Sequence, residues 1–596
     1  MTDKKNKPKN KKGVFLRLSK YVLQQWPLFI VALILTLLAN QLSLLGPKYS
    51  GAAIDAIELE SGVDFSSVWK NILFMLGCYV ISALFSYILS VIMIFLSQRI
   101  TYKMRKQVFE KLTTLPVNYF DTHATGDIIS HLSYDIDTIN STLSHDLIQV
   151  MTSIYTVVGS LLFMWQISKP MILIFALTVP VSLLFTKYRS KIVRPLFSKR
   201  AKKYGELNGF AEEMLTGSRT ISAYGTEDVI SSRFNKINDE AMDAFYKAEY
   251  SGALLFPTIN FINNISLTLV AVMGGILYMI SQNGTILAGS VFFITLGGVA
   301  QFVQYSRKFA GPINEFSNIL HEIQSAFSAA ERVFTILDEV PEKADNIDAV
   351  ELNNVKGDVL LNNVTFGYTE DKVILKNVSV NAKKGQTIAI VGPTGAGKTT
   401  IINLLMRFYD HRDGEILIDG IPSIKIKRGD LRLAFNMVLQ DTWLFYGTIY
   451  DNIVYGREDA TPEEVYAAAK AAKIDAYIES LPDGYNTVLS DDGVNISKGQ
   501  KQLITIARAF LSKAPILILD EATSNVDSRT EIQIQNAMTA LMENKTCFII
   551  AHRLSTIQNA DTILVIKDGT VIEQGNHEEL INQGSFYCSL YKSQFK

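Results

Sequence analysis

Long stretches without a charged residue dominate the first half of this chain. No Asp, Glu, Lys or Arg lies between Lys20 and Lys48 or between Lys70 and Arg99, and three further stretches of this kind follow before residue 307. A helix that crosses a lipid bilayer needs about 20 consecutive apolar residues. The last stretch is long enough for two such helices. The alternative is that these stretches are buried core helices of a soluble protein, which would then need six such helices within about 290 residues. The pattern therefore predicts six membrane spans, near 26–47, 70–98, 147–167, 170–187, 252–280 and 288–308.

Two long charged segments, 99–146 and 188–249, separate some of these spans. Their length predicts helices that extend the bundle beyond the membrane, because loops of this length inside a compact protein are normally structured. Each segment contains a polar, turn-prone stretch, at 118–126 and 216–219. We interpret these stretches as tips that dock on the second half of the chain, and solvated loops are the alternative.

The distribution of basic residues predicts the orientation of the spans. Residues 1–20 hold eight Lys or Arg and one acid, whereas residues 48–70 hold two basic and four acidic residues. Basic residues near the spans favour the cytoplasmic side. We therefore expect both termini and the second half in the cytoplasm. Residues 13–23 are expected to form an amphipathic helix on the inner membrane surface, and the first apolar run is too long for a signal peptide.

Composition supports a membrane protein with a different second half. Of the 596 residues 48% are hydrophobic and 19% are charged, below the roughly 25% usual for soluble domains. The net charge of −1 hides an excess of six positive charges in residues 1–340 and of seven negative charges beyond them. Nothing in this balance favours a nucleic-acid partner. Three distant cysteines support neither a disulfide framework nor a cysteine metal site.

The second half contains a phosphate-binding motif. After a polar, acidic linker, the β-rich run 387–391 leads into the pattern GxxxxGK[ST], and the apolar run 401–405 follows. Strand, loop and helix in this order are the context that the motif requires. Its backbone N–H groups can surround phosphate at a helix N-terminus. We expect ATP contacts at Gly392, Pro393, Thr394, Gly395, Ala396, Gly397, Lys398, Thr399 and Thr400. Among these, Lys398 would reach the β- and γ-phosphates and Thr399 would bind Mg²⁺.

Two further strand ends supply candidate catalytic groups. The buried-strand pattern 515–519 ends at Asp520 and Glu521. Asp520 suits Mg²⁺, and Glu521 can act as the general base that polarises the attacking water, although either carboxylate alone could be an ordinary loop acid. The apolar strand 546–551 ends at His552. A single histidine is more often structural, but its place at a strand end favours a role in sensing the γ-phosphate.

Taken together, these motifs resemble the nucleotide-binding domain of ABC transporters in order and spacing. The resemblance rests on Gly392–Thr399, Asn495–Gln500, Ile516–Glu521 and His552. It implies that Gln440 lies in the Q-loop, with a catalytic and metal-binding role, that Asp527 lies in the D-loop and that Tyr368 stacks on adenine. Six spans ahead of one such domain resemble a half-transporter of the exporter type, whose loop patterns are matched at 115–126 and 212–217.

The expected fold is an α-helical membrane domain joined to an α/β P-loop ATPase domain of ABC type. We place the membrane domain at 1–335, a linker at 336–353 and the ATPase domain at 354–596. By the resemblance, two ATPase domains pair head to tail and bind two ATP between them. Ser497, Gly499 and Gln500 would then act on the ATP of the partner chain.

One departure from the family pattern indicates which kind of second chain this protein is expected to pair with. The usual signature Leu-Ser-Gly-Gly-Gln reads Ile-Ser-Lys-Gly-Gln at 496–500, and Asp492 stands where the family usually has arginine. The composite site that this signature completes is therefore expected to be altered, while Glu521 and His552 match the consensus. This combination resembles the consensus-carrying half of heterodimeric bacterial multidrug exporters of the EfrD/LmrD kind. A homodimeric exporter or flippase for lipid or peptide is the alternative.

The spans themselves give weak information about substrate. They contain no acid or base, and their polar residues are amides and hydroxyls such as Asn260, Gln301 and Tyr305. A cavity of this character suits hydrophobic or amphipathic compounds, although such residues can equally join helices to one another. We therefore expect multidrug efflux across a bacterial cell membrane. A nucleotide-gated channel is the rival, and Glu521 argues against it because a gate needs no base.

Overall fold

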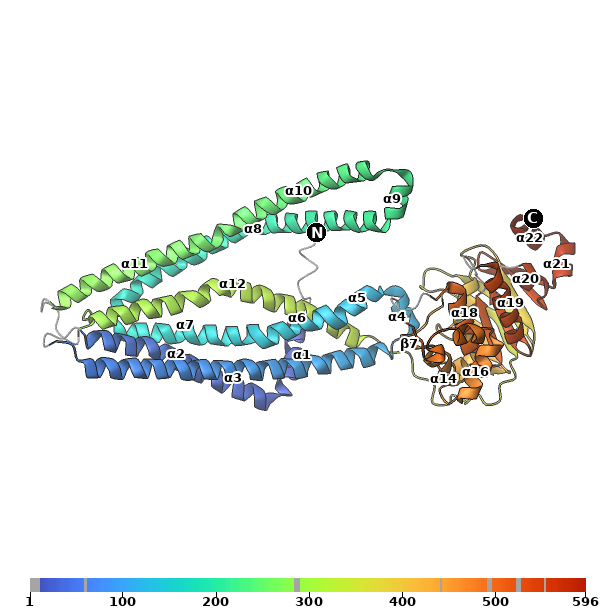
Figure 1. Ribbon diagram of the computed structural model, residues 1–596, viewed down its shortest axis with the longest axis horizontal. Coiled ribbons are helices and arrows are strands. Elements are labelled where there is room, and N and C mark those ends of the chain that lie inside the picture. The colour runs from blue at the N-terminus through green and yellow to red at the C-terminus, as the bar shows by residue number, and fades with distance from the viewer. Residues whose placement is uncertain are drawn as a thin grey trace. The chain divides into compact units, whose positions relative to one another are not determined.

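The structure is a computed structural model that describes residues 11–57, 62–282, 290–439, 442–489, 496–520, 527–550 and 554–595. The chain divides into two compact units (Figure 1). The helical unit comprises Met1–Thr114 and His123–Glu339, and the sheet unit comprises Leu115–Thr122 and Val340–Lys596. One short segment of the first half thus belongs with the second half. The domain boundaries expected from the sequence stay a prediction.

The described part of the helical unit consists of long helices. Their bounds are α1 (Lys11–Leu23), α2 (Trp26–Asp55), α3 (Phe65–Leu112), α5 (Thr125–Ser130), α6 (Ile136–Ser141), α7 (Leu147–Ile167), α8 (Lys169–Thr216), α9 (Ser218–Tyr224), α10 (Glu227–Ala253), α11 (Leu255–Gln282) and α12 (Leu296–Asp338). Two one-turn π-helical segments, η2 (His131–Asp135) and η3 (Thr142–Asp146), interrupt the path from α5 to α7. Figure 1 shows α8 and α10 side by side, joined through α9.

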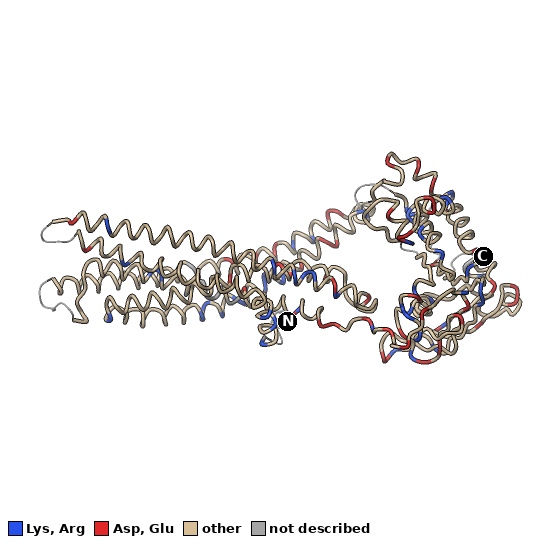
Figure 2. The backbone as a smooth tube through the Cα atoms, turned by 90° about the horizontal axis from the view of Figure 1, so that it is seen from below, with Lys and Arg blue, Asp and Glu red and all other residues tan. Residues whose placement is uncertain are grey.

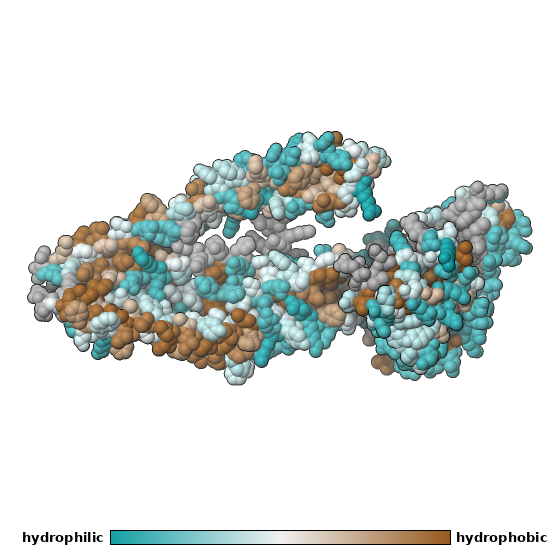
Figure 3. All heavy atoms as spheres, in the orientation of Figure 1, coloured by the Kyte–Doolittle hydropathy of each residue, from teal (hydrophilic) through white to brown (hydrophobic). Residues whose placement is uncertain are grey.

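Five helical stretches of the described residues are long and apolar enough to cross a membrane: Trp26–Asp55, Phe65–Leu112, Thr125–Ile167, Lys169–Thr216 and Glu227–Gln282. Figure 2 shows their apolar parts free of charged residues. Large apolar side chains such as Leu73, Phe95 and Leu177 are more than half exposed there, and hydrophobic atoms gather over α2 and α3 (Figure 3). Such a surface fits lipid, because soluble proteins rarely expose apolar patches of this size. The chain is a multi-pass membrane protein.

The sixth predicted span differs in part from the structure. It was expected at 288–308, but the described chain becomes helical only at the start of α12, Leu296. Thr295 caps this helix by accepting a hydrogen bond from Gly298 N at 3.0 Å. A capped helix start fixes where the backbone turns into the helix, and the sequence pattern alone missed it. Residues 283–289 lie outside the described part of the chain.

The charged segments between the spans are helical, as predicted. Helix α3 continues to Leu112 and helix α8 to Thr216, well past their apolar stretches. The expected tips coincide with helix ends, since α8 ends at Thr216 and the separate short helix α4 lies in the first tip. The amphipathic helix predicted at 13–23 is also present as α1. Its buried face packs on α12, where the Arg17 guanidinium lies 4.5 Å from the Phe334 ring centroid.

Three sheets and short helices form the described part of the sheet unit. Its strands are β1 (Val359–Phe366), β2 (Leu375–Ala382), β3 (Thr387–Val391), β4 (Asp413–Ile418), β5 (Ile421–Pro422), β6 (Phe435–Val438), β7 (Gly447–Thr448), β8 (Val488–Leu489), β9 (Ile516–Asp520), β10 (Thr546–Ile550), β11 (Thr562–Lys567) and β12 (Thr570–Gly575). Its α-helices are α4 (Val117–Thr122), α13 (Lys398–Leu405), α14 (Arg428–Leu433), α15 (Ile449–Val454), α16 (Pro462–Ala471), α17 (Asp475–Glu479), α18 (Lys498–Ser512), α19 (Ser528–Met542), α20 (Leu554–Gln558), α21 (His577–Gln583) and α22 (Phe586–Phe595).

The largest sheet has six strands in the order β12-β11-β3-β10-β9-β6. All neighbouring pairs are parallel except the edge pair of β11 and β12. Strands β3, β9 and β10 are buried along almost their whole length, which is typical of a parallel sheet covered on both faces. A second, antiparallel sheet has the order β2-β1-β4-β5. The carboxyl ends of β3, β9 and β10 therefore lie at one edge, where the candidate site residues follow.

Candidate nucleotide-binding site

The loop after β3 forms a concave backbone turn. Gly395 and Gly397 have φ of +80° and +105°, conformations that side-chain-bearing residues rarely adopt. A Cβ atom on Gly397 would also lie only 2.7 Å from Leu375 Cδ2. The helix α13 begins directly after this glycine, at Lys398. Free N–H groups at a helix start favour an anion, so the loop fits a phosphate chain.

Lys398 lies across the mouth of this loop. Its Nζ donates hydrogen bonds to Gly392 O at 2.8 Å and to Pro393 O at 3.1 Å. Burial lowers the pKa of the Lys398 ammonium, and the negative charge of Asp520 partly opposes this shift. A cation held by two neutral carbonyls gains most from an anionic ligand, since charge-assisted hydrogen bonds are stronger than neutral ones. Thr399 is exposed beside it, whereas Thr400 is buried.

Strand register brings Asp520 to the same sheet edge. Ile550 pairs with Asp520 on β9 and with Ile390 on β3. Asp520 is therefore level with the last residues before the phosphate loop. Its carboxylate and the Thr399 hydroxyl offer the oxygen ligands that Mg²⁺ prefers. The residues present thus fit this ion.

An aromatic cluster flanks the phosphate loop. Tyr368 Oη lies 3.2 Å from Thr400 Oγ1 and accepts a hydrogen bond from Asn403 Nδ2 at 3.2 Å. The rings of Phe366 and Tyr409 pack edge-on against Tyr368, with centroids 5.0 and 4.9 Å away. Tyr368 is 43% exposed, so part of its ring can stack on a base. Sequence reasoning found Tyr368 but missed Asn403, whose place one turn into α13 is the only clue.

The signature residues sit at the start of a different helix. Ser497 caps α18 in a reciprocal pair, in which Gln500 N donates to Ser497 Oγ at 3.2 Å and Ser497 N donates to Gln500 Oε1 at 2.9 Å. Gly499 is buried, and the Lys498 side chain is exposed. No described hydrogen bond joins these residues to the phosphate loop of the same chain. Lys498 therefore leaves the helix start intact and adds a cation at its surface.

Asp527 also caps a helix, α19, where its Oδ1 accepts a hydrogen bond from Thr530 N at 2.9 Å. This bond lowers the pKa of the Asp527 carboxyl. Three predicted site residues, Gln440, Glu521 and His552, lie outside the described residues. Their roles stay predictions that rest on the sequence alone.

The short helix α4, between the second and third membrane stretches, belongs to the sheet unit. Asp121 accepts a hydrogen bond from the Tyr409 hydroxyl. Burial raises the pKa of Tyr409, and the bond to Asp121 raises it further. Tyr409 also touches Tyr368, as described above. The part of the predicted docking tip that lies in α4, residues 118–122, belongs to the sheet unit, and Tyr409 is a partner that the sequence did not reveal.

By the resemblance to ABC exporters, replacing Asp121 by alanine should weaken this contact and uncouple ATP hydrolysis from transport. A hydrogen bond to a charged group contributes about 1.5–3 kcal/mol, less when it is exposed. We expect transport per ATP hydrolysed to fall by about threefold to tenfold. The ratio is measured in proteoliposomes containing the complete transporter. Asp127→Ala, on the neighbouring helix α5, is the control, and an unchanged ratio in Asp121→Ala would contradict a coupling role for this contact.

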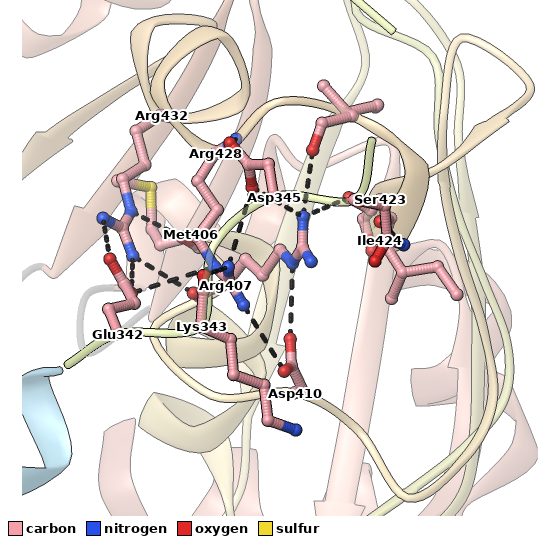
Figure 4. A network of polar contacts seen from close by, with 12 residues as sticks. Glu342, Lys343, Asp345, Met406, Arg407, Asp410, Ser423, Ile424, Arg428 and Arg432 are labelled. Atoms are coloured by element: carbon pink, nitrogen blue, oxygen red, sulfur yellow. Dashed lines mark hydrogen bonds and ion pairs between the residues drawn. The ribbon is translucent and has the colours of Figure 1, made fainter. Parts of the chain in front are cut away.

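A network of arginines binds the linker to the sheet unit (Figure 4). Arg432 binds Glu342 in a bidentate pair at 2.6 and 3.1 Å. Arg428 N donates to Asp345 Oδ2 at 3.0 Å. Arg407, almost fully buried, donates to Ile426 O at 2.9 Å. Buried arginines are tolerated when acids and carbonyls pair with them. The network therefore binds the linker to a segment that includes Arg407, two residues before Tyr409 in the chain.

Comparison with known proteins gives consistent matches along the chain. Residues 29–299 match the family model of the ABC transporter transmembrane region, and residues 375–524 match the ABC transporter model. The chain is 40% identical over 593 residues to an uncharacterised ABC transporter ATP-binding protein of Bacillus subtilis, covering 100% of this chain and 96% of that one.

Two further relatives have more specific names. The chain is 42% identical to a fatty acid ABC transporter ATP-binding/permease protein of Mycobacterium bovis, over 89% of this chain and 82% of that one. It is 33% identical to an ATP-dependent lipid A-core flippase of Syntrophus aciditrophicus, over 98% and 95%. A solved bacterial Atm1-family ABC exporter with ATP bound superposes with a TM-score of 0.74 at 29% identity, covering 95% of this chain and 98% of that one.

Proposed function

Since this chain belongs to the ABC transporter family, as a half-transporter of the exporter type, we propose that it exports hydrophobic or amphipathic compounds across a bacterial cell membrane. The family couples ATP hydrolysis in its ATPase domain to transport. In this proposal both termini and the sheet unit face the cytoplasm. The transport cycle is alternating access, in which ATP-dependent pairing of two sheet units reorients the spans.

The contact between α4 and Tyr409 is the observation that carries the coupling. Asp121 comes from the segment between two membrane stretches, and Tyr409 packs on Tyr368 at the nucleotide site. A change in the position of the nucleotide domain is thereby transmitted to two spans. If the ATPase domain were not coupled to the membrane spans, no contact between α4 and Tyr409 would be needed beside the nucleotide site.

The individual residues take distinct roles in this proposal. Tyr368 stacks on adenine, the loop 392–400 holds the phosphates, and Lys398 binds the β- and γ-phosphates. Thr399, Gln440 and Asp520 hold Mg²⁺, which neutralises developing phosphate charge when bound. Glu521 is the general base and His552 senses the γ-phosphate. Ser497, Gly499, Gln500 and Asp527 contribute to the interface with the second chain.

We further propose that the second chain is a different half-transporter with a degenerate ATP site. Lys498 carries an exposed cation at the helix start that completes the ATP site of the partner. In a heterodimer this alteration affects one of the two sites, whereas a homodimer would carry it twice. The names of two relatives, a fatty acid transporter and a lipid A-core flippase, favour the alternative of a lipid exporter, which a homodimer could perform.

The pairing is tested by purifying the full chain alone and measuring its ATPase rate and mass in lipid nanodiscs. A heterodimer half should hydrolyse ATP at about one tenth or less of the rate of the complete transporter, because each site needs the signature of another chain. The variant Lys498→Gly restores the usual signature and provides the comparison. Robust, cooperative hydrolysis by the chain alone would contradict the heterodimer and support the homodimeric alternative.

A further inference from the structure

Tyr368 lies in a turn whose backbone is held by one guanidinium group. The turn follows β1, and Arg412 Nη1 donates a hydrogen bond to Glu370 O at 2.9 Å, while Arg412 Nη2 donates to Thr369 O. Arg412 N donates to Thr365 O at 3.0 Å, which fixes Arg412 itself to β1. The main chain beside Tyr368 is therefore fixed, and only the torsions of its side chain are left to be set.

Two residues of α13 set these torsions at the far end of the ring. Thr400 and Asn403 are three residues apart, so they lie on one face of this helix. Tyr368 Oη accepts a hydrogen bond from Asn403 Nδ2 and lies within hydrogen-bond distance of Thr400 Oγ1, both at 3.2 Å. The edge-on rings of Phe366 and Tyr409 also limit rotation of the Tyr368 ring. The ring is thus held in one orientation, and part of it stays exposed.

The Asn403 side chain serves this contact specifically. Among the described residues, Tyr368 is the one hydrogen-bond partner of its amide, whereas the backbone bond from Phe408 N to Asn403 O, at 2.9 Å, does not depend on the side chain. Asparagine is a poor helix former, so helix formation does not explain its place on α13. Immobilising a side chain when a ligand binds weakens affinity, and a ring that is already fixed avoids this loss.

We propose that Asn403 is a positioning residue for the nucleotide base, which acts by holding Tyr368 in the orientation that stacks on adenine. The inference rests on the proposed function, in which Tyr368 stacks on adenine, and it adds a residue that the sequence motifs do not contain. Lys398 and Asn403 both belong to α13. One helix therefore presents the ammonium that binds phosphate and fixes the ring that receives the base.

Two ligands that share a triphosphate but differ in the base test this proposal. The non-hydrolysable ATP analogue AMP-PNP and inorganic tripolyphosphate, each with Mg²⁺, are titrated against the full chain in nanodiscs by calorimetry. We expect Asn403→Ala to raise the Kd of AMP-PNP about threefold to tenfold and to leave the Kd of tripolyphosphate unchanged. Tyr368→Phe keeps the ring but removes the hydroxyl, so it should give the same split, and it remains informative if Asn403→Ala fails to fold. The double variant should lose no more affinity than either single variant, because both remove one contact.

Asn536→Ala is the matched control, because it removes an exposed amide from another helix of the same unit, α19. It should bind both ligands as wild type does. An unchanged Kd of AMP-PNP in Asn403→Ala and Tyr368→Phe would overturn the proposal, as would additive losses in the double variant. Equal weakening of both ligands in Asn403→Ala would overturn it as well, since this result indicates a disturbed helix start rather than a displaced ring.

The variant Tyr368→Ala separates this inference from the proposed function. If it binds AMP-PNP as wild type does, stacking of Tyr368 on adenine is itself contradicted, and the role of Asn403 fails with it. If Tyr368→Ala weakens AMP-PNP binding while Asn403→Ala and Tyr368→Phe do not, only the positioning role of Asn403 is overturned.

Discussion

Replacing Glu521 by glutamine should nearly abolish ATP hydrolysis while ATP still binds. Glutamine keeps the size and shape of the side chain but cannot accept a proton from the attacking water. A positioned general base contributes about 10²–10⁴-fold to rate, so we expect the ATPase rate to fall by about that factor. The complete transporter should instead accumulate with bound ATP. Phosphate release and filter-bound radiolabelled ATP measure the two effects.

Glu543→Gln provides the control for this change. Glu543 is an exposed glutamate at the end of α19, and its variant should hydrolyse ATP as wild type does. The result separates the exporter from a nucleotide-gated channel, because gating by binding alone survives the loss of a base. A Glu521→Gln protein that hydrolyses ATP at an unchanged rate would refute the assignment of this residue as the base.

Replacing Lys398 by alanine should abolish hydrolysis for a different reason, the loss of ATP binding. Lys398 Nζ is held at the mouth of the phosphate loop by Gly392 O and Pro393 O. Removing it deletes charge-assisted hydrogen bonds to the phosphates, each of which contributes about 1.5–3 kcal/mol. We expect the Kd for ATP to rise by about 10²-fold. Fluorescence titration with a labelled ATP analogue measures this change.

Lys376→Ala is the matched control for Lys398→Ala. Lys376 is an exposed lysine on β2 of the same unit, and its variant should retain the wild-type Kd. The two catalytic-site variants are distinguishable, since Glu521→Gln retains ATP and Lys398→Ala does not. Undiminished ATP affinity in Lys398→Ala would contradict the phosphate-binding role of the loop.

Local patterns in the sequence were sufficient for most elements of the fold. Charge-free stretches predicted the spans because lipid excludes charged side chains over a fixed length. The phosphate loop and Asp520 were found because buried strands and the residues after them form short continuous patterns. The start of α12 at Leu296, inside the sixth predicted span, was missed, since it depends on the Thr295 cap rather than on hydropathy.

Partners that are distant along the chain could not be predicted in this way. Asp121 and Tyr409 are separated by 288 residues, and no periodicity relates them. Asn403 was missed because an amide in an amphipathic helix has no distinctive pattern. The arginine network was missed because Arg407, Arg428 and Arg432 look like ordinary surface residues until the linker packs against them.

The sequence by itself therefore determined the first five membrane spans, the phosphate loop and the family of this protein, since each depends on residues that are neighbours in the chain. Only the tertiary structure decided that α4 belongs with the sheet unit and that Arg332 of α12 pairs with the buried Asp135. That pairing depends on which residue of α12 lies opposite the Asp135 carboxylate. Long-range packing determines this pairing, because the charge of a buried carboxylate is stabilised by the groups that surround it in space.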